Sequence, residues 1–160
     1  MKIRSREMPA VEFRRELPAF LSDDPVCFIE VKARAGGLAN PVFMAARQDV
    51  IAVTMARNER VANTDDMALF DKAAVATKRA EADGRVAAIY DACVIEWTTN
   101  AVDTDTGAVM VTSGEAGRKN FIAFANAPVN ELAKMVIDLE VELILAGMRA
   151  VQQTEADVKN

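Results

Sequence analysis

The segment that follows Pro128 constrains the fold most, because it is apolar on two opposite sides. Placing residues about 100° apart, as in an α-helix, gathers its apolar side chains into two stripes separated by acidic residues. The first stripe contains Leu132, Val136, Leu139, Leu143 and Ala146, and the second contains Ile137, Val141, Ile144, Leu145 and Met148. Proline is favourable at the first position of a helix. We therefore expect a helix from Pro128 to at least Gly147, packed on both sides.

The second stripe has two interpretations, and the sequence leaves both open. In the first, the helix is central in the domain's own core, since helices that are apolar all round are usually buried. In the second, one stripe builds the core and the other receives an apolar helix from another chain. The partner-binding residues would then be Ile137, Val141, Ile144, Leu145 and Met148.

Alternating side chains near the N-terminus predict two short β-strands, at residues 11–13 and 26–32. In the second strand, one face carries Cys27, Ile29 and Val31. Residues 17–25 contain the proline, serine and aspartate residues of a connecting turn. Gly36-Gly37 predicts a flexible link after the second strand. We therefore expect an N-terminal β-hairpin.

The middle of the chain predicts two helices. Asn40-Pro41 is a favourable helix start, because the Asn side chain can accept hydrogen bonds from free backbone amides. The first helix is expected over residues 41–58, and the second over residues 64–97 with a break at Gly84. The second helix has an apolar stripe of Val86, Ile89, Tyr90, Cys93 and Trp97.

Residues 98–111 are polar and predict an exposed turn followed by a short extended segment. The run Asp103–Gly107 has some features of a calcium loop, but Ala108 and Gly114 stand where an EF-hand needs glycine and glutamate. A third helix is expected from Thr112, which forms a capping-box pattern with Glu115, to about residue 126.

These elements predict a mainly α fold, a helical domain of about four helices with a short N-terminal β-hairpin. We expect a single domain over residues 1–150, with the hairpin region at 1–38 and the helical core at 39–150. Residues 151–160 are polar and are expected to form a flexible tail.

The residue types disfavour most enzyme chemistry. The chain has no histidine, the side chain most used for acid–base catalysis and for binding zinc. It also lacks a phosphate-binding loop, and Cys27 and Cys93 lie in apolar runs where a thiol is usually a core residue. Asp65-Asp66 and the arginines at 34, 47 and 57 are better explained by helix capping and surface charge. We expect no enzyme activity, no cofactor and no metal site.

Charge and hydropathy limit the partners. The net charge of −5 disfavours a nucleic-acid binder, which needs clustered Lys and Arg. No apolar run approaches the length of a membrane span, and the N-terminus lacks the apolar segment of an export signal. We expect an intracellular protein that binds neither nucleic acid nor membrane.

The order of segments resembles the tail assembly chaperones of long-tailed phages and prophages. The similar features are a strand ending in Val31-Lys32-Ala33-Arg34, an Asn40-Pro41-Val42-Phe43 helix start and an Ala-rich run that ends in Trp97 before an acidic turn. The likeness covers about residues 26–147, and the first 25 residues match poorly.

This resemblance implies a protein of the host cytoplasm that coats the tape-measure protein, keeps it soluble while the tail assembles, and then leaves. The resemblance leaves open two further partners, the tail-tube protein and a second copy of the chain in a homo-oligomer. The alternative is a structural tail or neck component that remains in the virion. A small regulatory or enzyme subunit with unrecognised chemistry is the remaining rival.

Overall fold

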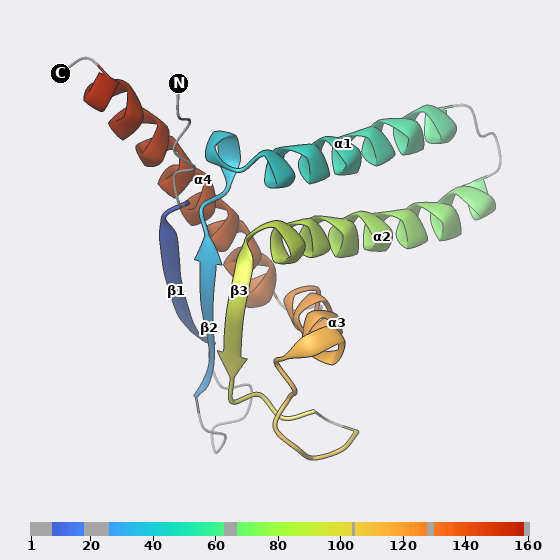
Figure 1. Ribbon diagram of the computed structural model, residues 1–160. Helices are drawn as coiled ribbons and strands as arrows, with labels where there is room; N and C mark the ends of the chain where they lie inside the picture. The colour runs from blue at the N-terminus through green and yellow to red at the C-terminus, as the bar shows by residue number, and fades with distance from the viewer. Residues whose placement is uncertain (1–7, 18–25, 63–66, 104, 128–129, 159–160) are drawn as a thin grey trace.

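The computed structural model describes residues 8–17, 26–62, 67–103, 105–127 and 130–158 (Figure 1). In chain order the described elements are β1 (Ala10–Leu17), β2 (Cys27–Arg34), the 3-10 helix η1 (Gly37–Ala39), α1 (Pro41–Ala62), α2 (Met67–Cys93), β3 (Val94–Thr99), α3 (Gly114–Ala125) and α4 (Asn130–Val158). The predicted mainly α class, with four helices, is confirmed for this part of the chain. The sheet differs from the prediction, because it has three strands.

The prediction of a short N-terminal hairpin was wrong in extent, because its two strands are longer than expected and form part of a three-stranded sheet. Strands β1 and β2 pair antiparallel from Ala10↔Arg34 to Leu17↔Cys27. The face of β2 that was predicted to be apolar points into the core, where Ile29 and Val31 are buried. The turn predicted between the strands falls on residues 18–25, outside the described residues.

The predicted second helix was wrong at its C-terminal end. Helix α2 ends at Cys93, and β3 begins at the next residue, Val94, so no loop separates them. Strand β3 pairs antiparallel with β2 and places Trp97 opposite Val31. Its sequence Val-Ile-Glu-Trp-Thr-Thr is rich in the β-branched and aromatic residues that favour strands. Helical spacing from Cys93 and strand alternation both place Trp97 on the core side, so periodicity alone could not separate them.

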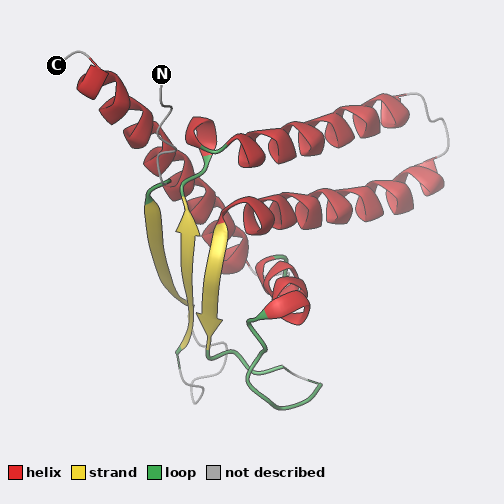
Figure 2. Cartoon of the chain, in the orientation of Figure 1, coloured by secondary structure: helices red, strands yellow, loops and turns green. Residues whose placement is uncertain are grey.

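Helices cover one face of the sheet (Figure 2). On that face Phe13, Val31 and Trp97 form a cross-strand row and are all buried. The Trp97 ring packs edge-on against Phe121 of α3, with ring centroids 5.2 Å apart. Residues of α4 complete the core: Met135, Val136, Leu139 and Leu143.

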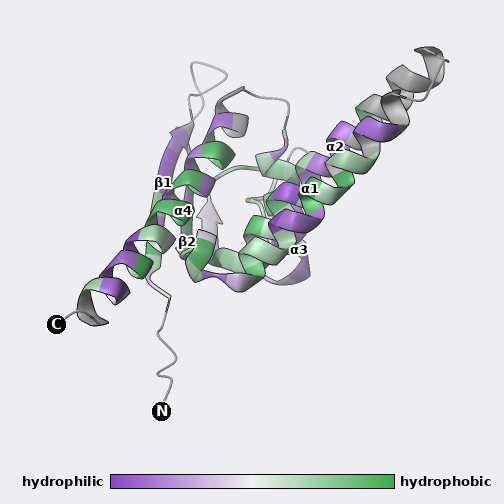
Figure 3. Ribbon diagram, turned by 90° about the horizontal axis from the view of Figure 1, so that it is seen from above, coloured by the Kyte–Doolittle hydropathy of each residue, from purple (hydrophilic) through white to green (hydrophobic). Residues whose placement is uncertain are grey.

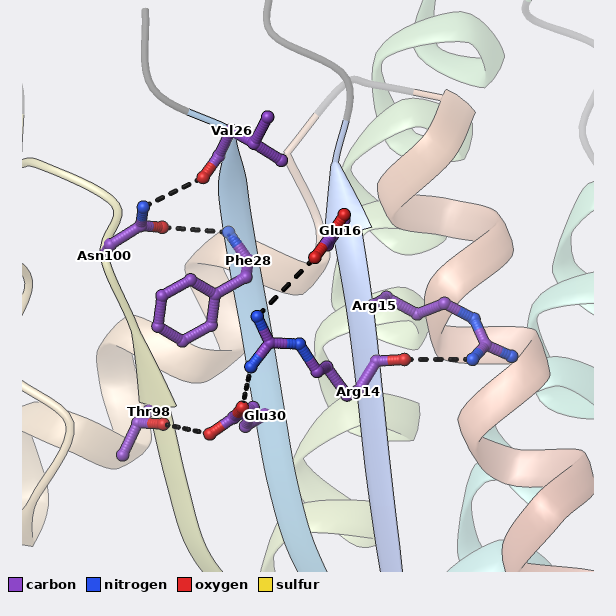
Figure 4. Close-up of polar contacts among 8 residues, drawn as sticks. All are labelled: Arg14, Arg15, Glu16, Val26, Phe28, Glu30, Thr98 and Asn100. Carbon is purple, nitrogen blue, oxygen red and sulfur yellow. Dashed lines mark hydrogen bonds and ion pairs between the residues drawn. The ribbon is translucent and has the colours of Figure 1, made fainter.

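The opposite face of the sheet is polar, and no helix of the described residues covers it (Figure 4). Arg14 of β1 pairs with Glu30 and Glu16, and its guanidinium lies 4.8 Å from the centre of the Phe28 ring. Asn100 extends the strand pairing, because its Oδ1 accepts a 2.8 Å hydrogen bond from the Phe28 amide and its Nδ2 donates to Val26 O. These polar side chains find their partners within the sheet itself, so they need no protein layer above them.

The predicted helix start at Asn40 is confirmed, and the Asn40 side chain does more than cap α1. Its Oδ1 accepts a hydrogen bond from the Phe43 amide at 3.2 Å. Its Nδ2 donates to the carbonyls of Ala35 and Ala92, each at 3.0 Å. Asn40 is fully buried. This one amide therefore joins the end of β2, the start of α1 and the end of α2.

Helices α1 and α2 pair antiparallel in an arm that extends away from the sheet and α4 (Figures 1 and 3). The break predicted at Gly84 is absent, and α2 passes through this residue. The predicted start of α2 at Thr64-Asp65-Asp66 lies outside the described residues. Several apolar side chains of the arm are exposed: Ile51, Val53, Met55 and Val75.

The flexible link predicted at Gly36-Gly37 is instead packed tightly against α4. Both glycines are buried, and the Gly36 amide donates a 2.9 Å hydrogen bond to Leu143 O. A Cβ at Gly147 would overlap the carbonyl oxygen of Gly36. Gly37 has a φ of 63°, which favours glycine. The glycines serve close backbone approach, which the sequence pattern did not distinguish from flexibility.

The C-terminal half differs from the prediction in two details. The α3 N-cap is Ser113, and it makes no side-chain capping bond, so the Thr112–Glu115 capping box is not the start of this helix. Helix α4 continues to Val158, into the segment 151–160 that was predicted to be a flexible tail. The exposed turn was predicted correctly: Asp103 Oδ1 accepts hydrogen bonds from the amides of Asp105 and Thr106, which lower the Asp103 pKa.

Candidate partner-binding surface

The two apolar stripes of α4 have different environments. Met135, Val136, Leu139 and Leu143 face the sheet and are at most 7% exposed. On the other side, four large apolar side chains are between 39% and 49% exposed: Ile137, Val141, Leu145 and Met148. We call these four residues the α4 stripe. The side chain of Leu132, predicted for the buried side, lies outside the described part.

The interpretation of α4 as a central helix, buried on both sides, is not what the structure has. Val141 and Leu145 are on the surface, and the described core is built from the opposite side of the helix. In Figure 3 hydrophobic and hydrophilic residues alternate along the coloured part of α4. A row of exposed apolar side chains along one helix is typical of a surface that another molecule covers.

Ile144 departs from the other predicted partner-binding residues. It is partly buried and packs against the core cluster. Gly37 lies against the Ile144 backbone and side chain, with the nearest atoms 3.5–3.6 Å from where a Gly37 Cβ would be. The crossing of η1 over α4 therefore covers Ile144. It forms the edge of the α4 stripe rather than part of its exposed centre.

A charged cluster next to the α4 stripe was not expected from the sequence. Glu140, one of the acidic residues between the two apolar stripes, is only 6% exposed. Arg85 of α2 donates to Glu140 Oε2 from Nε at 2.9 Å and also from its terminal nitrogen. Arg47 of α1 lies farther away, with Nε 4.0 Å from Glu140 Oε1. A buried carboxylate needs such partners, because isolated burial of a charge is costly.

These three residues line a pocket of about 230 Å³ between α1, α2 and α4. We call it the Arg47 pocket. Its remaining walls are apolar: Phe43, Val50, Ile51, Ala88 and Ile89. The side chains of Arg47 and Arg85 are each about half exposed at 48% and 47%. No sequence signal links residues 47, 85 and 140, because only the packing of the arm on α4 brings them together.

The cysteines are core or near-core residues, as predicted. Cys93 is buried and Cys27 is partly buried, and both are free thiols. Burial raises the pKa of Cys93 to about 11 and also raises the pKa of Cys27. A high pKa disfavours the thiolate, which is the nucleophilic form.

Comparisons with known proteins identify no relative: no family model matches the sequence, and neither a curated protein nor a solved structure is significantly similar. Within the described ranges, no cluster of three or more Cys, Asp or Glu side chains is arranged to bind a metal ion. The helices in that part of the chain are all too short or too polar to cross a bilayer. The α4 stripe and the Arg47 pocket are the candidate binding features of the described surface.

Proposed function

We propose that this protein is a tail assembly chaperone of a long-tailed phage, which holds an apolar helical segment of the tape-measure protein against the α4 stripe. The observation that carries this proposal is the exposure of four large apolar side chains on one face of a helix whose other face is core. Such a face suits an amphipathic helix, which docks through residues at i, i+3, i+4 and i+7 spacing.

The tape-measure protein as partner rests on the resemblance in the order of segments, and one part of that resemblance changes. The Trp97 segment was compared with the end of a helix, whereas it is strand β3. The strand before Asn40-Pro41, the helix that follows it and the acidic turn after Trp97 are retained. A long helical protein that waits to be packaged would aggregate unless its apolar faces were covered, which gives a chaperone a physical role.

The proposal predicts that Val141→Asp abolishes partner binding while the domain stays folded. A charge in the centre of the α4 stripe opposes an apolar partner but costs the free protein little, within about 1 kcal/mol, because Val141 is half exposed. The measurement is co-expression with the tape-measure protein of the same phage, followed by co-purification and thermal melting of the free variant. Glu142→Gln, an exposed change outside the stripe, is the control and should bind normally.

Two results would count against the proposal. If Val141→Asp still keeps the tape-measure protein soluble, the α4 stripe is not the binding surface. If mass spectrometry finds the chain in purified, DNA-filled particles, the structural tail or neck component is favoured, because a chaperone leaves before the particle is complete.

A further inference from the structure

The Arg47 pocket borders the α4 stripe. Glu140 lines the pocket, and the residues three before and four after it, Ile137 and Ile144, are its neighbours on the helix surface. Ile137 belongs to the stripe, and Ile144 forms its edge. A helix docked along the stripe would therefore have one flank over the pocket.

The charge of the pocket is unbalanced. It contains the guanidinium groups of Arg47 and Arg85 and the single carboxylate of Glu140. Arg85 makes both hydrogen bonds to Glu140, whereas Arg47 reaches the same carboxylate only at 4.0 Å. Among the described residues, Glu140 is the one carboxylate within 4.0 Å of an Arg47 side-chain nitrogen. Arg47 thus offers a half-exposed cation above an apolar floor, with its hydrogen-bonding capacity largely unused.

Resting on the proposed function, we propose that the partner is an amphipathic helix that carries a carboxylate on one flank of its apolar stripe, and that this carboxylate pairs with Arg47. The apolar stripe supplies contact area, and the ion pair fixes which flank of the partner faces α1 and hence its direction and register. Charge pairs at interface margins act in this way, since they select partner and orientation more than they add affinity.

The surroundings disfavour a lipid surface as the occupant. The opposite margin of the stripe carries Asp138 and Glu142, with Arg149 two turns beyond Glu142 and Arg15 lying 3.8 Å from Asp138, and the whole chain has a net charge of −5. Helices that lie on membranes are typically rich in Lys and Arg on their polar face, which attracts anionic headgroups. A flank of mixed charge on one side and the guanidinium of Arg47 on the other instead suit a protein helix of defined orientation.

The test uses two fluorescein-labelled peptides with the purified full chain. Each is an amphipathic helix with leucines at i, i+3, i+4 and i+7 spacing, one with Glu on a single flank and the other with Gln at that position. We expect the Glu peptide to bind the unaltered protein at least about fivefold more tightly at low salt, measured by fluorescence anisotropy. Arg47→Gln should remove this preference while leaving the affinity for the Gln peptide unchanged.

Arg149→Gln is the matched control, because it removes an exposed arginine from α4 outside the Arg47 pocket. It should keep the preference for the Glu peptide. Arg47 is altered rather than Arg85, since loss of Arg85 would leave the buried Glu140 without its main partner. Circular dichroism melting of each variant shows that it is folded.

The outcomes separate the two proposals. Loss of binding of both peptides in Val141→Asp would support the α4 stripe as the site. The role of Arg47 is overturned if the unaltered protein binds the Glu and Gln peptides equally, or if Arg47→Gln still prefers the Glu peptide. If Val141→Asp binds both peptides normally, or neither peptide binds the unaltered protein, the docking surface itself is wrong. If size-exclusion chromatography shows a dimer that Val141→Asp dissociates and that excludes both peptides, the occupant is a second copy, which also overturns the proposal.

Discussion

At the scale of single residues, Asn40 links three elements of the fold through one side chain. Its amide makes hydrogen bonds to β2, α1 and α2 from a fully buried position. The sequence predicted only the cap, because a cap is a local pattern. The bonds to Ala35 and Ala92 depend on packing, and nothing in the local sequence around residue 92 indicates them.

We expect Asn40→Ala to lower the free energy of unfolding by about 2–4 kcal/mol, because it removes four hydrogen bonds, including one to Cys93 Sγ, and leaves two buried carbonyls with fewer donors. Urea denaturation followed by circular dichroism measures the loss. Asn120→Ala, which removes one exposed bond to Val111 O, should cost less than about 1 kcal/mol. Equal losses in the two variants would show that the bonds of Asn40 are not made.

The Cys93 thiol should resist alkylation in the folded protein. Its pKa is raised from the ordinary 9.0 to about 11 by burial, so at pH 8 its thiolate fraction is about 100-fold below that of an ordinary thiol. Iodoacetamide labelling followed by peptide mass spectrometry should modify Cys93 more slowly than the less buried Cys27, and both quickly in urea. Fast labelling of Cys93 at pH 8 without denaturant would contradict its burial.

The same pKa shift predicts a pH dependence of stability. The thiol proton is held more tightly in the folded state than in the unfolded state, so the contribution of Cys93 is fully present below about pH 9. It is lost as the pH rises towards 11. The free energy of unfolding should therefore fall over this window more steeply in the unaltered protein than in Cys93→Ala.

At the scale of elements, the crossing of Gly36-Gly37 over α4 requires glycine at position 147, where the two backbones meet. Gly147 and Gly84 both lie inside long helices, where alanine is intrinsically favoured by about 0.5–1 kcal/mol. We expect Gly147→Ala to destabilise the protein by at least about 2 kcal/mol, because its methyl group would overlap Gly36 O.

Gly84→Ala should instead stabilise the protein, since the nearest atom to the added methyl group is Val50 Cγ2 at 3.9 Å. Thermal and urea denaturation of the pair measures the difference. Stabilisation by both substitutions would mean that the backbone of residue 36 does not approach α4 as closely as described.

The sequence predicted elements well where one periodicity ruled out the other. The alternation at residues 27–31 excluded a helix, and the cap at Asn40 marked the start of α1. It failed at Val94–Thr99, because those residues satisfy a helical stripe and a strand equally well. Pairing with the edge of β2 that β1 leaves free selects the strand, and the sequence of residues 94–99 does not show that this edge is close by. For the candidate site, the exposed residues of the α4 stripe were in the predicted set, whereas the Arg47 pocket required three distant segments to meet.

At the scale of the whole molecule, the arm of α1 and α2 is less tightly packed than the rest of the described fold, the sheet with α3 and α4, which we call the body. In the arm, Ile51, Val53, Met55 and Val75 are more than half exposed, whereas the body buries Ile29, Leu139 and Leu143 almost completely. Segments with few buried apolar contacts open at lower free energy.

We expect backbone amides of residues 50–56 to exchange with deuterium faster than those of residues 29–33 and 139–143. Hydrogen–deuterium exchange with mass spectrometry on the free protein measures this order. Equal protection would show that the arm is covered, and repeating the experiment across a range of protein concentrations would reveal whether another copy covers it.

The junction at Cys93 and Val94 couples the position of the arm to the sheet. The last residue of α2 is followed directly by the first of β3, so a displacement of the arm passes without an intervening loop to the start of β3, where the register with β2 shifts between Lys32 and Ala33. Trp97 lies four residues after Cys93 and is buried in the core. We therefore expect a ligand that moves the arm to change the environment of the buried Trp97 ring, which its fluorescence would report.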